Sequence, residues 1–123
     1  MSIDRKERGR ELARRYFGRE ITPDQEDDPF FVPALEHLFG EIWTREGLSL
    51  RDRALVTISS LVALGRNREL GIHLHGAMNV GVTQDEIQEM IVHLGYYGGF
   101  PTAASGREVF KKVLEARRGD HPS

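Results

Sequence analysis

Two residues that could transfer protons, Glu69 and His73, lie four positions apart in the segment 66–81. A helix advances about 100° per residue, so this spacing places both side chains on one face, with Arg66 one turn earlier. A carboxylate beside an imidazole raises the pKa of the imidazole and fixes its orientation, which suits general acid–base catalysis near neutral pH. The same spacing is equally typical of an ordinary polar pair that stabilises a helix.

A metal site is another interpretation of this segment. Glu69 and His73 could chelate one ion, but His75 diverges from His73 on a helix, and no third or fourth ligand is evident. We therefore predict no metal. His93, one turn after Glu89, is expected to be a surface or interface histidine whose hydrogen bonds are satisfied.

Three arginines, Arg45, Arg51 and Arg53, flank the start of the apolar segment 54–64. A guanidinium can bind a carboxylate through two parallel hydrogen bonds, so one of them could hold an acidic substrate. Surface solvation and salt bridges at an interface are the alternatives. Trp43 is expected to anchor the core or an interface, because its large ring contributes mainly buried area.

The composition describes an ordinary globular protein. The 123 residues are 39% hydrophobic and 29% charged, which predicts a single domain over 1–123. A net charge of −2 gives no general attraction to nucleic acid or to an anionic membrane. The absence of cysteine excludes disulfides, thiolate metal sites and cysteine redox chemistry. Because the first residues are charged and no long apolar run occurs, we expect a cytoplasmic protein without a membrane span.

Helical periodicity and capping signals predict an all-α fold of about six helices, with no strand alternation. The expected helical segments are 4–17, 29–43, 49–65, 67–81, 83–99 and 101–119. The acidic segment 19–29 has two prolines and no periodicity, so it is expected to be a loop, and 119–123 a frayed tail. Gly71 and Gly76 lie inside a helical segment, which predicts close approach of another backbone or of a ligand.

The segments "IWTREGL", "RELGIHLHGAMNVGVTQDEI" and "YYGGFPTA" resemble the γ-carboxymuconolactone decarboxylases, within the alkyl hydroperoxidase D-like superfamily. The resemblance covers nearly the whole chain. It implies an all-helical subunit that assembles into trimers or hexamers, with sites close to subunit contacts. By this resemblance, His73 stands at the position of the superfamily's histidine. Arg66 and Glu69 stand where peroxidase-type relatives carry a C-x-x-C pair, so a thiol peroxidase role is not expected.

The resemblance also implies a reaction, which is loss of CO2 from a carboxylated lactone in the protocatechuate branch of aromatic degradation. No metal or organic cofactor is expected, because the lactone itself accepts the electrons left by CO2. His73 would be the acid or the donor to the developing oxyanion, and Glu69 would orient it. The residues expected to bind the substrate are Arg53, Arg45, Arg66, Trp43 and Tyr97.

Two departures from the family pattern keep other functions open. The segment "GREITPDQEDDP" is acidic and lacks the family's histidine, and an acidic loop near the site would repel a dicarboxylate. The sequence Tyr97-Gly98-Gly99 stands where the family frequently has Tyr-Cys-Gly. The alternatives are a paralogue acting on another lactone or a keto-acid-like substrate, or a non-catalytic oligomer that binds small molecules.

Overall fold

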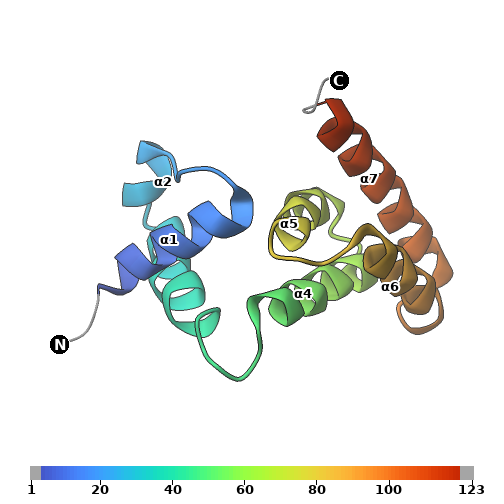
Figure 1. Ribbon diagram of the computed structural model, residues 1–123, viewed down its shortest axis with the longest axis horizontal. Coiled ribbons are helices and arrows are strands. Elements are labelled where there is room, and N and C mark those ends of the chain that lie inside the picture. Colours follow the sequence, from blue (N-terminus) through green and yellow to red (C-terminus); the bar gives the residue numbers. More distant parts are fainter. Residues whose placement is uncertain (1–3, 120–123) are drawn as a thin grey trace.

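The computed structural model describes residues 4–119, and within this range the secondary-structure elements are all helices, joined by short loops, without strands (Figure 1). The α-helices are α1 (Arg5–Phe17), α2 (Pro23–Asp27), α3 (Phe31–Pro33), α4 (Leu50–Leu64), α5 (Asn67–Asn79), α6 (Gln84–Tyr97) and α7 (Phe100–Gly119), and the π-helix η1 (Ala34–Ile42) continues directly from α3. The predicted all-α class is confirmed. Of the expected tail, Gly119 ends α7, and 120–123 lie outside the described residues.

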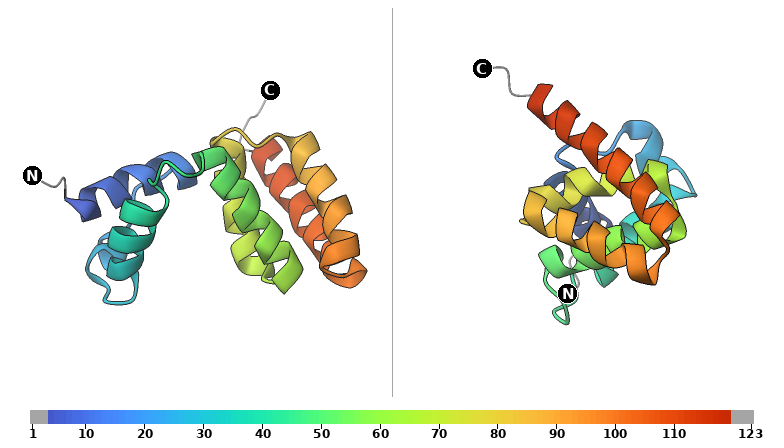
Figure 2. Two further views of the ribbon diagram at one scale, coloured as in Figure 1. Left: turned by 90° about the horizontal axis from the view of Figure 1, so that it is seen from below. Right: turned by 90° about the vertical axis from the view of Figure 1, so that its right-hand side faces the viewer.

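The helices form two groups. Helices α4 to α7 pack together as a bundle, and α1 packs mainly against η1 (Figures 1 and 2). Contacts between α1 and α5 join the groups. The core of the bundle includes Leu70, Leu74 and Ala77 of α5, all fully buried. None of the helices in 4–119 is both long and apolar enough to cross a membrane.

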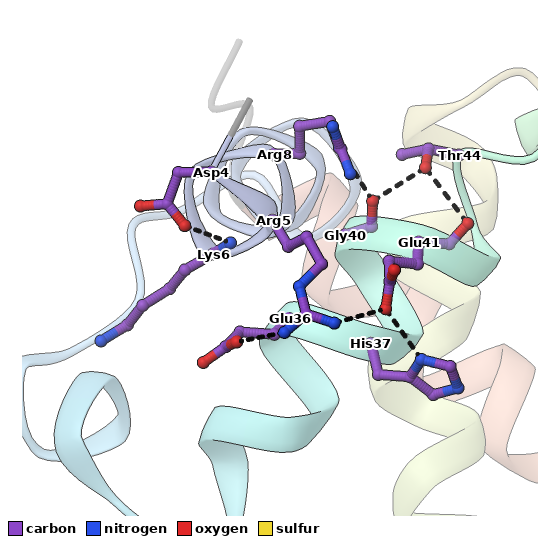
Figure 3. Close-up of polar contacts among 9 residues, drawn as sticks. All are labelled: Asp4, Arg5, Lys6, Arg8, Glu36, His37, Gly40, Glu41 and Thr44. Atoms are coloured by element: carbon purple, nitrogen blue, oxygen red, sulfur yellow. Dashed lines mark hydrogen bonds and ion pairs between the residues drawn. The ribbon is translucent and has the colours of Figure 1, made fainter. Parts of the chain in front are cut away.

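Glycines allow α1 and η1 to approach closely. A Cβ atom on Gly9 would overlap the Leu35 carbonyl oxygen, and one on Gly40 would overlap the Arg5 carbonyl oxygen. Arg8 Nε donates to the Gly40 carbonyl at 3.1 Å. Arg5 forms ion pairs with Glu36 and Glu41 across the same contact (Figure 3). Backbone contact therefore fixes how these two helices cross.

The segment 29–43 is helical, as predicted, but most of it is π-helix rather than α-helix. The Trp43 N–H bonds to the Leu38 carbonyl at 2.8 Å, which is a five-residue step. Hydrophobic periodicity over nine residues does not distinguish the two helix types, and π-helices are rare enough that the sequence favours α.

The prediction that 19–29 is a loop is wrong in part, because α2 forms within it. The Gln25 N–H donates to Thr22 Oγ1 at 3.2 Å, and the Thr22 N–H donates to Gln25 Oε1 at 3.0 Å. This capping box, with Pro23 in the first turn, satisfies the N–H groups that a short helix leaves exposed.

Candidate active site

His73 of α5 lines a hollow of about 300 Å³ whose other lining residues come from α1, η1 and the segment between them. This volume is at the lower end of the range of small-molecule sites, and the lining is mostly apolar, as is usual for such sites. The lining residues are Ala13, Phe17, Arg19, Glu20, Ile21, Gln25, Phe30, Phe31, Ala34, Leu35, Phe39 and His73. The ring of His73 is only partly buried, so one side of it can meet a ligand.

Tyr16 holds the ring of His73 in place. Its hydroxyl oxygen lies 2.8 Å from His73 Nδ1 and 3.3 Å from the His73 carbonyl oxygen. Tyr16 is fully buried and packs against Trp43 and Phe17, with ring centroids 4.9 Å away in both cases. No local sequence pattern pairs Tyr16 with a histidine 57 positions later, so this contact could not be predicted from the sequence.

Burial determines the protonation of the His73 imidazole and the Tyr16 phenol. It lowers the pKa of His73 from the ordinary 6.5, and the charge of Glu69 opposes this effect without overcoming it. The predicted net rise in the pKa of this imidazole is therefore wrong. Burial also raises the pKa of Tyr16, so its phenol keeps its proton at neutral pH.

The tautomer of the neutral His73 ring determines what it offers to a ligand. The Tyr16 hydroxyl lies within hydrogen-bond distance of both Nδ1 and the His73 carbonyl oxygen, and it has one proton to donate. When that proton goes to Nδ1, the ring proton resides on Nε2. Nε2 makes no hydrogen bond within residues 4–119, so in this tautomer His73 presents an N–H donor to a ligand in the hollow.

Glu69 does not hold the ring directly. Its Oε2 accepts from Arg68 Nη1 at 3.3 Å, and in the described chain it makes no hydrogen bond to His73. Tyr16 thus makes the orienting hydrogen bond that the sequence assigns to Glu69. The effect of Glu69 on His73 is Coulombic.

The five residues expected to bind substrate do not line this hollow within one chain. Trp43 and Arg45 line a second hollow of about 420 Å³ on the other side of α1. Arg53 donates to the Arg45 carbonyl at 3.2 Å, and its buried Nε has no hydrogen-bond partner among residues 4–119. Arg66 is exposed at the start of α5. Tyr97 is 80% exposed and stacks on His93, with ring centroids 4.8 Å apart.

The acidic segment 19–29 does border the hollow, and two of its five acidic side chains are paired with arginines. Glu20 forms an ion pair with Arg14, and Glu26 forms one with Arg10. Neither Asp24 nor the other aspartates of the segment line the hollow. The repulsion of a dicarboxylate expected from this segment is therefore reduced by pairing.

No group of three or more acidic or histidine side chains within 4–119 is arranged to hold a metal ion. The groups at the hollow that can exchange protons or bind charge include the imidazole of His73, with the phenol of Tyr16 behind it, and the side chains of Arg19 and Glu20 at the edge.

Replacing Glu69 with glutamine is expected to lower the pKa of His73 further, because the charge that opposes the effect of burial is removed. Below the ordinary pKa of 6.5, the unfolded chain binds a proton that the folded chain does not, so stability falls as the pH drops. This acid-side loss should be larger in Glu69→Gln. NMR titration of the His73 imidazole and urea unfolding at neutral and acidic pH measure the two effects.

Glu89→Gln is the matched control for this prediction, since it removes the same charge from α6, away from the hollow. It should leave the pKa of His73 unchanged. A raised or unchanged pKa in Glu69→Gln would contradict the Coulombic role of Glu69.

Known proteins resemble this chain over 63–70% of its length. It is 43% identical over 77 residues to a 4-carboxymuconolactone decarboxylase of Acinetobacter baylyi, covering 63% of this chain and 58% of that protein. It is 34% identical over 90 residues to a nitrosuccinic acid decarboxylase of Metarhizium robertsii, covering 70% of this chain and 63% of that protein. An uncharacterized 15.0 kDa protein of Paracoccus denitrificans is 34% identical over 86 residues, covering 67% of this chain and 64% of that protein. The chain thus spans about three fifths of the length of each relative.

The carboxymuconolactone decarboxylase family matches residues 31–112, which is more than half of the chain. The matched range includes η1, α4, α5, α6 and the part of α7 up to residue 112, and His73 lies within it. Together with the two decarboxylases among the relatives, this match confirms the resemblance seen in the sequence. The chain belongs to the carboxymuconolactone decarboxylase family.

Proposed function

We propose that this protein is a decarboxylase for a small dicarboxylic acid that itself accepts the electron pair left by CO2. The observation that carries the proposal is the ring of His73, which lines an apolar hollow while Tyr16 fixes its Nδ1. The two relatives whose names state an activity are both decarboxylases, which supports the same class of reaction.

The substrates in those two names share their chemistry. In 4-carboxymuconolactone, the electrons left by CO2 spread through the conjugated ring to the lactone carbonyl oxygen. In nitrosuccinic acid, they pass to the oxygens of the nitro group. Each compound has a second carboxylate that it retains. Both reactions therefore need a hydrogen-bond donor at the oxygen that gains charge, and neither needs an organic cofactor as electron acceptor.

His73 would supply that donor. As the bond between the carbon and the departing carboxylate breaks, its electron pair moves to the accepting oxygen, which the Nε2–H of His73 stabilises. The carbon then takes a proton from water, so each turnover releases one CO2 and takes up one proton. Phe17, Phe31 and Phe39 give the hollow an apolar wall, which favours conversion of a localised carboxylate charge into a dispersed one.

The substrate that we propose first is 4-carboxymuconolactone, on the protocatechuate route of aromatic degradation. The relative that bears this name has the higher identity, 43% against 34% for the nitrosuccinic acid enzyme. The second candidate is a nitrosuccinate-like acid, and its support is the longer matched segment of 90 residues. Both candidates use the same role for His73.

We also propose that the chain functions as a homo-oligomer, as the family resemblance implies. An apolar patch formed by Leu64, Tyr96, Tyr97 and Phe100 is more than two thirds exposed at every position. It lies where the end of α6 approaches α4 and leads into α7. Burial of such a patch against another copy would remove a large apolar area from water. Tyr97 and Arg66 would then act near a subunit contact rather than in the hollow of their own chain.

Purified protein is expected to release CO2 from 4-carboxymuconolactone, measured by ¹³C NMR of the labelled departing carboxylate. In D2O, the product should carry one deuterium at the carbon that is protonated, because water supplies that proton. Nitrosuccinic acid is the second substrate to be assayed. If neither acid yields CO2 above the rate without protein, the decarboxylase proposal fails and the ligand-binding alternative gains.

A further inference from the structure

The backbone at Arg19 is held in place at the edge of the hollow. Gly18 ends α1 with φ +76°, a conformation that favours glycine, and Arg19 follows it directly. Asn79 Nδ2 donates to the Tyr16 carbonyl at 2.8 Å, which ties the end of α1 to α5. The backbone at Arg19 is therefore positioned by the same two helices that carry Tyr16 and His73.

Arg19 is a cationic residue of the lining, and its charge is uncompensated by the described part of the chain. Besides His73, the ionisable side chains of the lining are Arg19 and Glu20. Glu20 is paired with Arg14. Within residues 4–119, Arg19 has neither an ion pair nor a side-chain hydrogen bond, although acidic residues surround it in the sequence.

Of the nearby acids, two are engaged elsewhere and two lie outside the lining. Glu26 pairs with Arg10, and Asp28 Oδ1 accepts from the Phe30 N–H at 2.9 Å. Asp24 and Asp27 lie on α2 outside the lining. An exposed arginine left without a partner beside an apolar hollow is available to an anionic ligand.

We propose that Arg19 binds the carboxylate that the substrate retains, while His73 contacts the group that receives the electrons. This inference rests on the proposed function. A cation beside the departing carboxylate would stabilise the reactant more than the transition state, so the available cation suits the carboxylate that stays. A guanidinium can bind that group with two parallel hydrogen bonds, which also orients the substrate. Arg19 thereby selects acids with a second carboxylate.

The place of Arg19 in the chain fits a role in specificity. The family match begins at residue 31, so Arg19 lies outside it, as do Glu20, Ile21 and Gln25 of the same edge. His73 lies inside the match. The residue that stabilises charge and the residue that selects the substrate thus come from different parts of the chain.

The test uses 4-oxopentanoate and its carboxamide, 4-oxopentanamide, as probes. Both have a ketone oxygen for His73, but only the first has a carboxylate for Arg19. We expect the wild-type protein to bind the acid at least about tenfold more tightly than the amide, as measured by calorimetry. The imidazole NMR signal of His73, assigned with His73→Phe, should shift with both probes and so locate binding in the hollow.

Arg19→Gln should abolish the preference for the acid, and Arg19→Lys should retain part of it, since lysine keeps the charge without the planar fork. Arg15→Gln is the matched control, because Arg15 is exposed on α1 and does not line this hollow. It should keep the full preference. Circular dichroism verifies the fold of each variant.

The outcomes separate this proposal from the proposed function. Loss of the preference in Arg19→Gln, together with no CO2 release from either acid, supports Arg19 as a carboxylate-binding residue while the decarboxylase proposal fails. A preference that survives in Arg19→Gln, or that is absent from the wild type, overturns the role of Arg19 whatever the turnover. Equal losses in Arg19→Gln and Arg15→Gln also overturn it, because they indicate a general charge effect.

Discussion

Replacing His73 with phenylalanine is expected to lower kcat for CO2 release by about a hundred- to a thousandfold, the usual effect of removing one oxyanion donor. Phenylalanine keeps an aromatic ring against Tyr16 and Phe17 but removes both ring nitrogens. The Tyr16 hydroxyl retains the His73 main-chain carbonyl as an acceptor at 3.3 Å, so the fold should survive. The measurement is the turnover number at saturating 4-carboxymuconolactone.

His93→Phe is the matched control for this substitution. It makes the same chemical change on α6, where the ring stacks on Tyr97 and does not line the hollow. Its kcat should stay close to that of the wild type. If His73→Phe retained full turnover with intact helical circular dichroism, His73 would have no part in the reaction.

Replacing Gly76 with alanine is expected to destabilise the protein by about 1–3 kcal/mol or more, the typical cost of overpacking a core. A Cβ atom there would overlap the Cε2 and Cζ atoms of Tyr16, which is fully buried and cannot move freely. The strain would displace the phenol from His73 Nδ1. Urea unfolding measures the loss of stability, and the His73 imidazole NMR signal measures the change at the ring.

Gly71→Ala gives the opposite expectation on the same helix. Its Cβ would lie 3.6 Å from Val109 Cγ1, which is an ordinary contact. Alanine should therefore stabilise α5 by up to about 1 kcal/mol, because glycine is a poor helix former. If both substitutions stabilised the protein, the close packing of Tyr16 on Gly76 would be disproved.

The helices could be predicted from sequence because their determinants are local. The capping box of α6 was readable from Thr83 and Glu86, and in the structure the Glu86 N–H donates to Thr83 Oγ1 at 3.1 Å. A similar box at Thr22 and Gln25 begins α2. The residue types of this second box are equally visible in the sequence, but the prolines and acids that dominate the segment favour a loop.

The candidate site was predictable only in part, because its partners are distant in sequence. Spacing within one helix identified His73, which does line the hollow. The hydrogen bond from Tyr16 depends on how α1 crosses α5, and that crossing depends on the bare backbone at Gly76. The direction in which the pKa of His73 shifts could not be predicted for the same reason. Desolvation of this ring follows from packing and not from its nearest charged neighbour.

The two sides of the hollow differ in how much change they tolerate. Helix α5 presents His73 from a densely packed interior, where a single added methyl group at Gly76 is costly. The segment 19–30 lies at the surface and is joined to α1 by ion pairs such as Glu20 with Arg14, and solvent screens exposed pairs of this kind so that they add little stability. A duplicated gene could therefore acquire new side chains along this edge with little risk of unfolding. Such substitutions would produce enzymes that act on different acids and retain His73.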